Sequence, residues 1–390
     1  MKKKFIWIIV GVIAAFVVVV GGYASYVALQ YSRIENELPL EVYRQSNKKT
    51  IQIGEEYSIS TYNIGFGAYS PDFDFFMDEG IMKTGEKVKG HRGTAISKDH
   101  VLQDVNGAYQ FIKNVNPDFM FFQEVDTNST RSYHVNEWEL GNDYFDTYDY
   151  TFASNFHSAF LLYPFNDPHG KVNSGIVTYS RYFIHNATRY SFTVSKGFDK
   201  FFDLDRCFSM STIDIQNGKL LFLVNLHMSA YDKGGVIRKK QMEELSAFLT
   251  QMKEQGHYIV VGGDFNHDLL TYNPDYNYTE DALPFKEETE QLKPDWLSFF
   301  FHQDGSSLLP EGFKVVASDN TSTCRAAEMP WKKGINYVTV VDGFIVSDNI
   351  EVVEHKNLVT SSEEIEGYAF SDHQPAFMKF KLLEDTNRTL

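Results

Sequence analysis

Cysteine is nearly absent from this sequence. The 390 residues include two cysteines, Cys207 and Cys324. A disulfide-rich scaffold is therefore excluded, and so is a zinc site built from several cysteines. A single disulfide bond between the two remains compatible with the sequence, because a domain outside the cell would meet an oxidising environment.

Basic residues are in short supply as well. Lysine and arginine number 36 against 52 aspartates and glutamates, which gives a formal net charge of -16 at pH 7. Proteins that bind nucleic acid without specificity present a basic surface, so this balance argues against a general polyanion-binding protein. It does not exclude an enzyme that handles phosphate through a metal ion. With 43% hydrophobic and 23% charged residues, the composition is that of a globular chain.

Acidic residues are missing from the first 33 positions. This stretch holds Lys2, Lys3, Lys4 and Arg33, a charge of +4. The remainder holds 32 basic and 52 acidic residues, a charge of -20. The chain therefore joins two chemically different parts.

The first part has the composition of a membrane segment. Residues 5–29 carry no charge, and residues 5–22 are almost wholly apolar. About 20 apolar residues span a bilayer, so we expect a transmembrane anchor over residues 1–30. The lysine cluster should stay in the cytoplasm. This predicts a single-pass protein of the cell membrane, with a cytoplasmic N-terminus and an extracellular C-terminal domain.

A cleaved signal peptide is the alternative for this segment. The apolar core of a signal peptide is shorter, about 7–15 residues, and is followed by small residues at the cleavage site. The apolar run here is longer, although Gly21, Gly22, Ala24 and Ser25 offer small residues. Length favours the uncleaved anchor.

The rest of the chain divides into a polar stalk over residues 31–50 and one globular domain over residues 51–385. Apolar runs that predict strands cover residues 57–62, 119–122, 174–179, 208–215, 220–226, 258–262, 343–346 and 376–382. Helical spacing covers residues 101–115 and 238–253. This mixture predicts an α/β (α+β) fold in which two packed sheets are flanked by helices. Residues 267–312 lose the periodicity and form either a functional loop beside the site or a surface excursion.

The polar residues that stand out lie at the ends of these strands. A rigid scaffold presents side chains into a cleft from such positions. The residues are Asn63, Glu124, His227, Asp264, Asn266, Asp342, Asp372 and His373. Each has an ordinary explanation when taken alone, such as a salt bridge for Glu124, a turn for Asp264 and Asn266, or a core histidine for His227. Their joint occurrence at strand ends favours a shared site.

The residue types divide into two chemical groups. Asn63, Glu124 and Asp372 offer oxygen atoms that suit a hard cation such as Mg²⁺, with Mn²⁺ as an alternative. The second group is His373, Asp342, Asp264, Asn266 and His227. A histidine oriented by an aspartate can accept a proton from water, and Asn266 and His227 can donate hydrogen bonds to phosphoryl oxygens. Together the groups suit the hydrolysis of a phosphate ester.

These motifs resemble the endonuclease/exonuclease/phosphatase superfamily, which includes deoxyribonucleases and neutral sphingomyelinases. The matching pieces are Thr61-Tyr-Asn63, Phe122-Gln-Glu124, Asn173-Ser-Gly-Ile-Val-Thr-Tyr-Ser-Arg181, Asn225-Leu-His227, Gly262-Gly-Asp-Phe-Asn266, Val341-Asp342-Gly-Phe and Ser371-Asp-His-Gln-Pro375. They span about residues 51–382, and the Gly-Asp-Phe-Asn and Ser-Asp-His-x-Pro motifs are the specific ones. The resemblance implies a four-layer α/β sandwich and Mg²⁺-dependent phosphoesterase chemistry.

The resemblance also implies roles for individual residues. Glu124 would be the principal metal ligand, aided by Asn63 and Asp372. His373 would activate water while paired with Asp342. Asp264 and Asn266 would position the nucleophile and the phosphate, and His227 would be the second histidine of the deoxyribonuclease and sphingomyelinase branches.

No motif fixes the residues that contact the phosphate. Arg181 and Arg325 are candidates for substrate binding, and so is Tyr231. The basic segment 83–98 is either a phosphate-recognition loop or a solvated surface loop.

The sequence thus predicts an extracellular, membrane-anchored, Mg²⁺-dependent phosphoesterase. The substrate is either nucleic acid, for a nuclease, or a phospholipid or small headgroup phosphodiester, and no protein partner can be inferred. The alternative from another functional class is a noncatalytic surface binding protein on the same scaffold, for which damaged site residues are expected.

Overall fold

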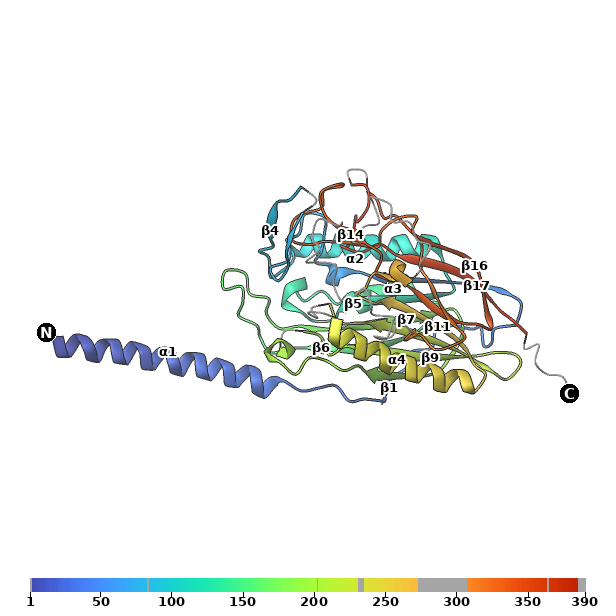
Figure 1. Cartoon of the computed structure of the whole chain (residues 1–390), viewed down its shortest axis with the longest axis horizontal. Helices are drawn as coiled ribbons and strands as arrows, with labels where there is room; N and C mark the ends of the chain where they lie inside the picture. Colours follow the sequence, from blue (N-terminus) through green and yellow to red (C-terminus); the bar gives the residue numbers. More distant parts are fainter. Residues whose placement is uncertain are drawn as a thin grey trace.

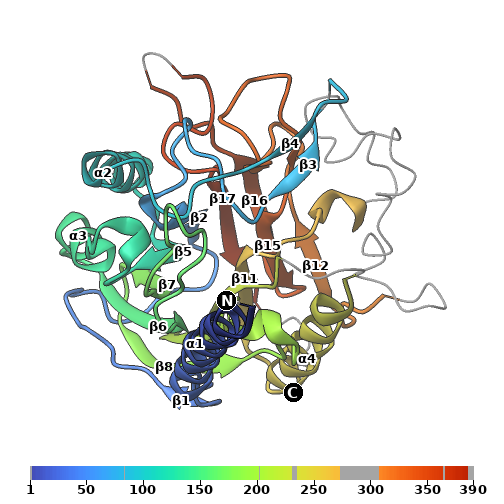
Figure 2. The ribbon, with the colours of Figure 1, turned by 90° about the vertical axis from the view of Figure 1, so that its left-hand side faces the viewer.

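The computed structural model describes residues 2–82, 84–201, 203–230, 235–272, 307–362 and 365–384. A long helix, α1 (Lys2–Gln30), projects from a body in which two sheets pack face to face between outer helices (Figure 1). The helices of the body are α2 (Lys98–Val115), α3 (Glu137–Tyr144) and α4 (Val236–Glu254). Figure 2 shows α2 and α3 on one side of the sheets and α4 on the other. The predicted four-layer α/β sandwich is confirmed.

The first sheet has seven strands. In spatial order they are β1 (Leu38–Pro39), β8 (Ile184–Ser191), β9 (Cys207–Asp214), β10 (Leu220–His227), β11 (Tyr258–Asp264), β15 (Asp342–Ser347) and β12 (Phe313–Val316). Only β10 and β11 pair in parallel. The carboxyl ends of these two strands therefore meet at the same edge of the sheet.

The second sheet has six strands. In spatial order they are β16 (Ile350–Asn357), β17 (Ala376–Leu382), β2 (Glu56–Asn63), β5 (Phe119–Asp126), β7 (Asn173–Ser180) and β6 (Asp149–His157). Here β2 and β5 form the parallel pair. Two small hairpins stand apart from the sheets, β3 (Glu79–Ile81) with β4 (Lys87–Lys89), and β13 (Cys324–Arg325) with β14 (Val338–Thr339).

Apolar faces explain the layers. One core cluster lies between the two sheets and includes Ile59, Phe121, Leu223 and Val260. A second cluster packs α2 against β5 and β7, and a third packs α4 against β10 and β11. Strands β5 and β10 are buried on both faces, which is why they read as continuous apolar runs rather than alternating ones.

Helix α2 shows how local sequence sets an element's limits. The Ser97 side chain accepts a hydrogen bond from the backbone N–H of His100 and so caps the first turn. At the other end Asn116 adopts a left-handed conformation, and Pro117 follows it. The left-handed conformation of Asn116 and the proline after it end the helix where the sequence predicts.

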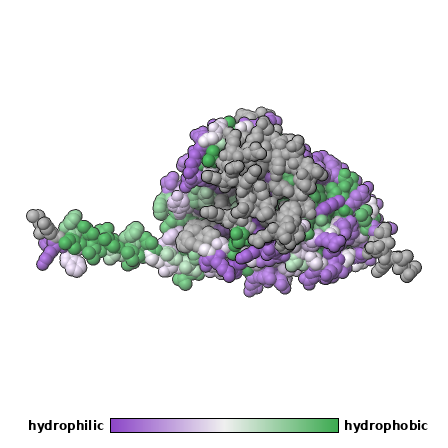
Figure 3. Space-filling model, viewed as in Figure 1, coloured by the Kyte–Doolittle hydropathy of each residue, from purple (hydrophilic) through white to green (hydrophobic). Residues whose placement is uncertain are grey.

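Helix α1 is long and apolar enough to cross a membrane, and a signal sequence near an N-terminus would have the same properties. Figure 3 shows it as a mostly apolar rod beside a body with much hydrophilic surface. The residues after it lie against the body. Arg33 forms an ion pair with Asp205 at 2.7 Å, and residues 38–39 form strand β1. The segment expected to be a stalk thus contributes an edge strand to the first sheet.

Both cysteines are free thiols. Cys207 is buried in strand β9, whereas Cys324 lies in the small strand β13 beside the predicted site. Most of the predicted loop 267–312, including its aromatic residues from position 273 to 306, lies outside the described residues.

Candidate active site

A cleft of about 530 Å³ opens at the edge where the two parallel strand pairs end. Six of the predicted residues line it, namely Glu124, Asp264, Asn266, Arg325, Asp372 and His373. Asn63, His227 and Asp342 lie behind them, fully or almost fully buried. The structure therefore brings residues that are 310 positions apart in the sequence, such as Asn63 and His373, into hydrogen-bond distance.

Strand register places the buried members. In the parallel pair β10 and β11, His227 lies opposite Asp264. In the antiparallel pair β11 and β15, Asp264 lies opposite Asp342. In the other sheet Asn63 is the last residue of β2, next to Gln123 on β5. Facing sheets thus deliver these side chains to one place, as the strand-end pattern predicts.

Asp264 is the centre of the hydrogen-bond network. Its Oδ2 accepts a hydrogen bond of 2.9 Å from Nδ2 of Asn63, and its Oδ1 accepts one of 2.7 Å from the backbone N–H of Asn266. The same Oδ2 lies 3.4 Å from Nε2 of His227 and 3.8 Å from Nε2 of His373. The Asp264 carboxylate therefore holds the Asn63 amide by a hydrogen bond and lies close to both imidazoles.

His373 and Asp342 form a buried pair. Nδ1 of His373 lies 2.8 Å from Oδ2 of Asp342. Burial alone would lower the pKa of His373, but Cys324, Asp342 and Asp264 outweigh it and raise that pKa well above its usual value. Burial raises the pKa of Asp342 to about 6, although His373 opposes the change. This pairing directs the other ring nitrogen, Nε2, away from Asp342.

Glu124 stands at a break in strand β5. The pairing of β5 with β7 shifts between Phe122 and Val125, and Glu124 adopts a positive φ of 56°. Such a conformation is unusual for a residue with a side chain and is typical of functional positions. Burial and the neighbouring Asp372 raise the pKa of Glu124 to about 8. The pKa of Asp372 is also raised, first by burial.

These carboxyl groups fit a divalent cation. Ligand atoms of Glu124, His227 and Asp264 lie within 4.8 Å of one another, and those of Asp264, Asp342 and His373 do so as well. Burial raises the pKa of both Glu124 and Asp372 although His373 and nearby arginines oppose the change, and a bound cation would supply further positive charge beside these carboxylates. The oxygen-rich donor set suits Mg²⁺ or Mn²⁺ better than a metal that prefers sulfur.

Two buried arginines, which the sequence analysis did not identify, also line the cleft. Nη1 of Arg206 donates a hydrogen bond of 2.7 Å to Nε2 of His227. Arg131 forms two hydrogen bonds, of 3.0 and 2.9 Å, with the carboxylate of Asp126. Neither arginine belongs to a motif with a distinctive spacing.

The residues predicted to contact the phosphate lie in different parts of the chain's structure. Arg325 lines the cleft, where its guanidinium donates to the backbone oxygens of Ser70, Ala326 and Met329. Arg181 follows the far end of β7 and bonds to Asn116, so the structure does not bring it to the cleft. Tyr231 lies outside the described residues.

The basic segment has acidic partners in its described part. Lys87 and Lys89 of the β3–β4 hairpin form ion pairs with Glu79 at 2.7 and 3.5 Å. His91 and Arg92 lie near Asp74. The two lysines are thus exposed and paired with Glu79, whereas Glu79, Gly80 and Ile81 of the same hairpin line the cleft.

Comparison with known proteins agrees with this fold. Residues 61–308 match the Endonuclease/Exonuclease/phosphatase family. The TDP2 protein of Caenorhabditis elegans has a similar structure, with 16% sequence identity, a TM-score of 0.50, and coverage of 84% of this chain and 75% of that chain. The human Nocturnin catalytic domain with bound sulfate has 14% identity, a TM-score of 0.50, and coverage of 88% and 97%.

A third similar structure is ANGEL2, a 2′,3′-cyclic phosphatase in complex with adenosine-2′,3′-vanadate. It has 14% identity, a TM-score of 0.52, and coverage of 90% of this chain and 99% of that chain. No curated protein sequence matches the chain. At these identities the structural likeness concerns the fold.

The four-layer sandwich and its cleft of carboxylates and histidines define a phosphoesterase fold of the divalent-metal-dependent class. The chain belongs to the Endonuclease/Exonuclease/phosphatase family, whose members are hydrolases of phosphate esters. The predicted family and enzyme class are confirmed. Asp342, Asp372 and His373 lie beyond the matched residues, so their place in the site comes from the geometry described above.

Proposed function

We propose that this protein is a membrane-anchored, extracellular, Mg²⁺-dependent enzyme that hydrolyses a phosphate ester. The observation that carries the proposal is the pair of His373 and Asp342, 2.8 Å apart, at a cleft lined by Glu124 and Asp372. An oriented imidazole beside clustered carboxylates is the arrangement that water activation and metal binding require.

His373 is the proposed general base. Asp342 accepts the hydrogen bond from Nδ1–H, which leaves Nε2 to take a proton from water. Nε2 lies 3.4 Å from Nδ2 of Asn63 and 3.8 Å from Oδ2 of Asp264, so the ring cannot swing freely. Asp264, one of the groups that raise the pKa of His373, has a ligand atom within 4.8 Å of one from Glu124, so a cation bound there would offset its charge.

Glu124, Asp372 and Asn63 are the proposed ligands of Mg²⁺. A bound divalent cation would neutralise the charge that develops on the phosphoryl oxygens. The remaining polar residues position the reacting groups. Asn266 is held by Asp264 and by the backbone oxygen of Met228, to which its Nδ2 donates at 2.9 Å. Asn266 has a positive φ of 49° and lines the cleft.

The substrate is either nucleic acid or a phospholipid or headgroup phosphodiester. The charge of -20 outside the first 33 residues gives a nucleic acid no general electrostatic attraction.

Contacts of α1 with the body support a retained anchor. The Tyr23 hydroxyl donates to the backbone oxygen of Phe160 at 3.1 Å, and the Tyr26 hydroxyl accepts from the N–H of Phe160 at 3.1 Å.

The test is a substrate panel with the full-length protein in detergent micelles. Nucleic acids, phospholipids, nucleotides and sugar phosphates are each offered with Mg²⁺ and with a chelator. We expect hydrolysis of at least one class, which the chelator abolishes. The variants Glu124→Gln and His373→Ala should lose it, while the matched variants Glu351→Gln and His355→Ala, at exposed positions of β16, should retain it.

Two results would contradict the proposal in different ways. Absence of metal-dependent turnover on every class would argue for the noncatalytic binding protein. Full activity in both Glu124→Gln and His373→Ala would instead refute the assigned roles.

A further inference from the structure

An apolar hairpin projects from the body beside helix α1. It comprises residues 158–170 between β6 and β7, and its base is closed by two backbone hydrogen bonds of 3.0 Å between Leu161 and Gly170. Its tip exposes large apolar side chains. Relative exposure is 38% for Phe160, 40% for Leu162, 51% for Tyr163 and 83% for Phe165. We call residues 160–165 the apolar tip.

The apolar tip contains no charged side chain. The hairpin 158–170 contains one charged residue, Asp167. Its carboxylate turns inward and accepts hydrogen bonds from the backbone N–H groups of Gly93 and Thr94 and from the Thr94 hydroxyl. An apolar medium could therefore receive the tip without burying an unpaired charge. Exposed apolar clusters of this kind mark interaction surfaces.

Helix α1 sets the depth of the apolar tip relative to a bilayer. Residues 5–22 rise about 27 Å as a helix, close to the roughly 30 Å of a hydrocarbon core. Tyr23 therefore falls at the outer boundary, where tyrosine is favoured. The Tyr23 hydroxyl binds the backbone of Phe160 and Leu162, and the Tyr26 hydroxyl binds Phe160. In Figure 1 the hairpin extends from the body on the side from which α1 projects.

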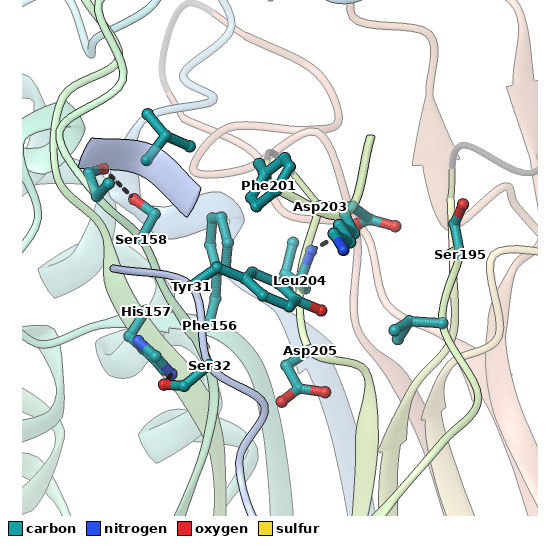
Figure 4. Close-up of a pocket in the computed structure, with 14 residues that line it drawn as sticks. Tyr31, Ser32, Phe156, His157, Ser158, Ser195, Phe201, Asp203, Leu204 and Asp205 are labelled. Carbon is teal, nitrogen blue, oxygen red and sulfur yellow. Dashed lines mark hydrogen bonds between the residues drawn. The ribbon is translucent and has the colours of Figure 1, made fainter. Parts of the chain in front are cut away.

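The end of α1 lies close to the cleft. A cavity of about 20 Å³ lies where the end of α1 meets the body, with Tyr31 and Ser32 on one wall (Figure 4). Phe156, Asp203 and Leu204 line both this cavity and the large cleft. One layer of side chains thus separates the end of α1 from the cleft.

A second connection runs through Phe76, whose ring lies 5.5 Å from that of Tyr163. Phe76 is the neighbour of Phe75 and Met77 in the cleft wall. The apolar tip is therefore connected to the cleft wall through Phe76.

We propose that the apolar tip docks into the outer interface of the lipid bilayer beside α1. The docked tip would hold the cleft at the membrane surface and direct it to phosphate esters of membrane lipids. The docking surface rests on the contacts of α1 and the exposed side chains. The choice of lipid over nucleic acid rests in addition on the proposed phosphoesterase function.

Docking is tested with the full-length protein in phosphatidylcholine vesicles. The variant Phe165→Trp reports on the tip, and Val353→Trp is the matched control, because Val353 on β16 is also an exposed apolar residue, at 42%. Fluorescence of each is compared with the parent protein, which has four tryptophans. We expect a blue shift and quenching by brominated lipid for Phe165→Trp and neither for Val353→Trp. Equal quenching in the two variants would overturn docking.

The substrate class is tested with the variants Phe165→Asp and Val353→Asp. With Phe165→Asp we expect hydrolysis of vesicle phospholipid to fall about tenfold, because one apolar side chain no longer enters the interface. Hydrolysis of the soluble diester bis(p-nitrophenyl) phosphate should not change, and Val353→Asp should match the parent on both. Turnover of the soluble diester without any turnover of phospholipid would overturn the lipid assignment. Absence of both activities would instead contradict the proposed function, while the quenching result would still decide docking.

Discussion

Nδ1 of His373 lies 2.8 Å from Oδ2 of Asp342, and both side chains are buried. This contact joins strand β15 to the turn before β17, which belong to different sheets. The pair is therefore a direct link between the two halves of the sandwich at the cleft. Its chemistry and its position both depend on the packing of the sheets.

The first prediction concerns this pair. Asp342→Asn keeps the shape of the side chain but removes the charge that orients and stabilises a protonated His373. We expect kcat to fall by about 10²–10⁴, with little change in KM, since the contact acts through the base rather than on the substrate. His373→Ala should cost a similar factor. The double variant should be no worse than His373→Ala, and additive losses in steady-state kinetics would contradict a shared role.

The second prediction concerns the stability of the metal-free protein. Burial and Asp372 raise the pKa of Glu124 to about 8, whereas an unfolded glutamate titrates near 4.3. Between these values the folded state binds a proton that the unfolded state has released. Stability contributed by this group is therefore present at pH 5 and lost as the pH rises toward 8.

We expect the melting temperature in chelator to decrease from pH 5.5 to pH 8. Glu124→Gln should flatten this decrease, because the amide cannot ionise, and Mg²⁺ should restore the parent's melting temperature at pH 8. Thermal unfolding of both proteins in chelator and in Mg²⁺ measures the effect, with Glu351→Gln as the exposed control. A parent protein that melts at a higher temperature at pH 8 than at pH 5.5 in chelator would contradict it.

Much of the fold followed from local pattern. Strands β5, β10 and β11 are buried runs of apolar residues. The predicted site residues His227 and Asp264 are the last residues of β10 and β11, whereas Glu124 lies within β5, two residues before its end. Strand β16 was not predicted. It is an edge strand with exposed charges at Glu351 and Lys356, so its pattern does not differ from that of a solvated loop.

The site was predictable where one residue follows one strand. His227 and Asp264, the last residues of β10 and β11, are of this kind. Arg206 was not predictable, because its partner His227 lies 21 positions away and the two meet only when β9 and β10 pair. Arg181 was a candidate that no motif fixed, and it follows the carboxyl end of β7, which is the end that points away from the cleft. Whether a residue at the end of a strand belongs to the site therefore depends on which end of that strand points toward the cleft.

The third prediction separates these two arginines. Burial and the charge of Arg206 lower the pKa of His227 well below its usual value, so the imidazole is neutral. Arg206→Gln removes the charge, so the pKa of His227 should rise. If the neutral form is required, activity at pH 5.5–6.5 should fall more than activity at pH 8. Arg181→Gln, at the far end of β7, should leave the pH–rate profile unchanged. A shifted profile in Arg181→Gln, or an unshifted one in Arg206→Gln, would contradict these placements.

The fourth prediction concerns the glycine that precedes Asp264. Gly263 has a φ of 146°, and a Cβ there would lie 2.0 Å from the backbone oxygen of Leu226 on β10. The backbone of β10 cannot move without displacing His227, so Gly263→Ala should cost about 3 kcal/mol or more of unfolding free energy. The folded fraction should also lose activity, because Asp264 moves with its neighbour.

Gly218→Ala provides the matched control. Gly218 also has a positive φ, of 80°, but no atom lies within 4 Å of the added Cβ. Conformational strain alone should then cost about 1 kcal/mol and leave activity per folded molecule unchanged. Denaturant unfolding and metal-dependent turnover are measured for both variants. Equal losses would mean that strain at positive φ, rather than the close approach of β10 and β11, explains the glycine before Asp264.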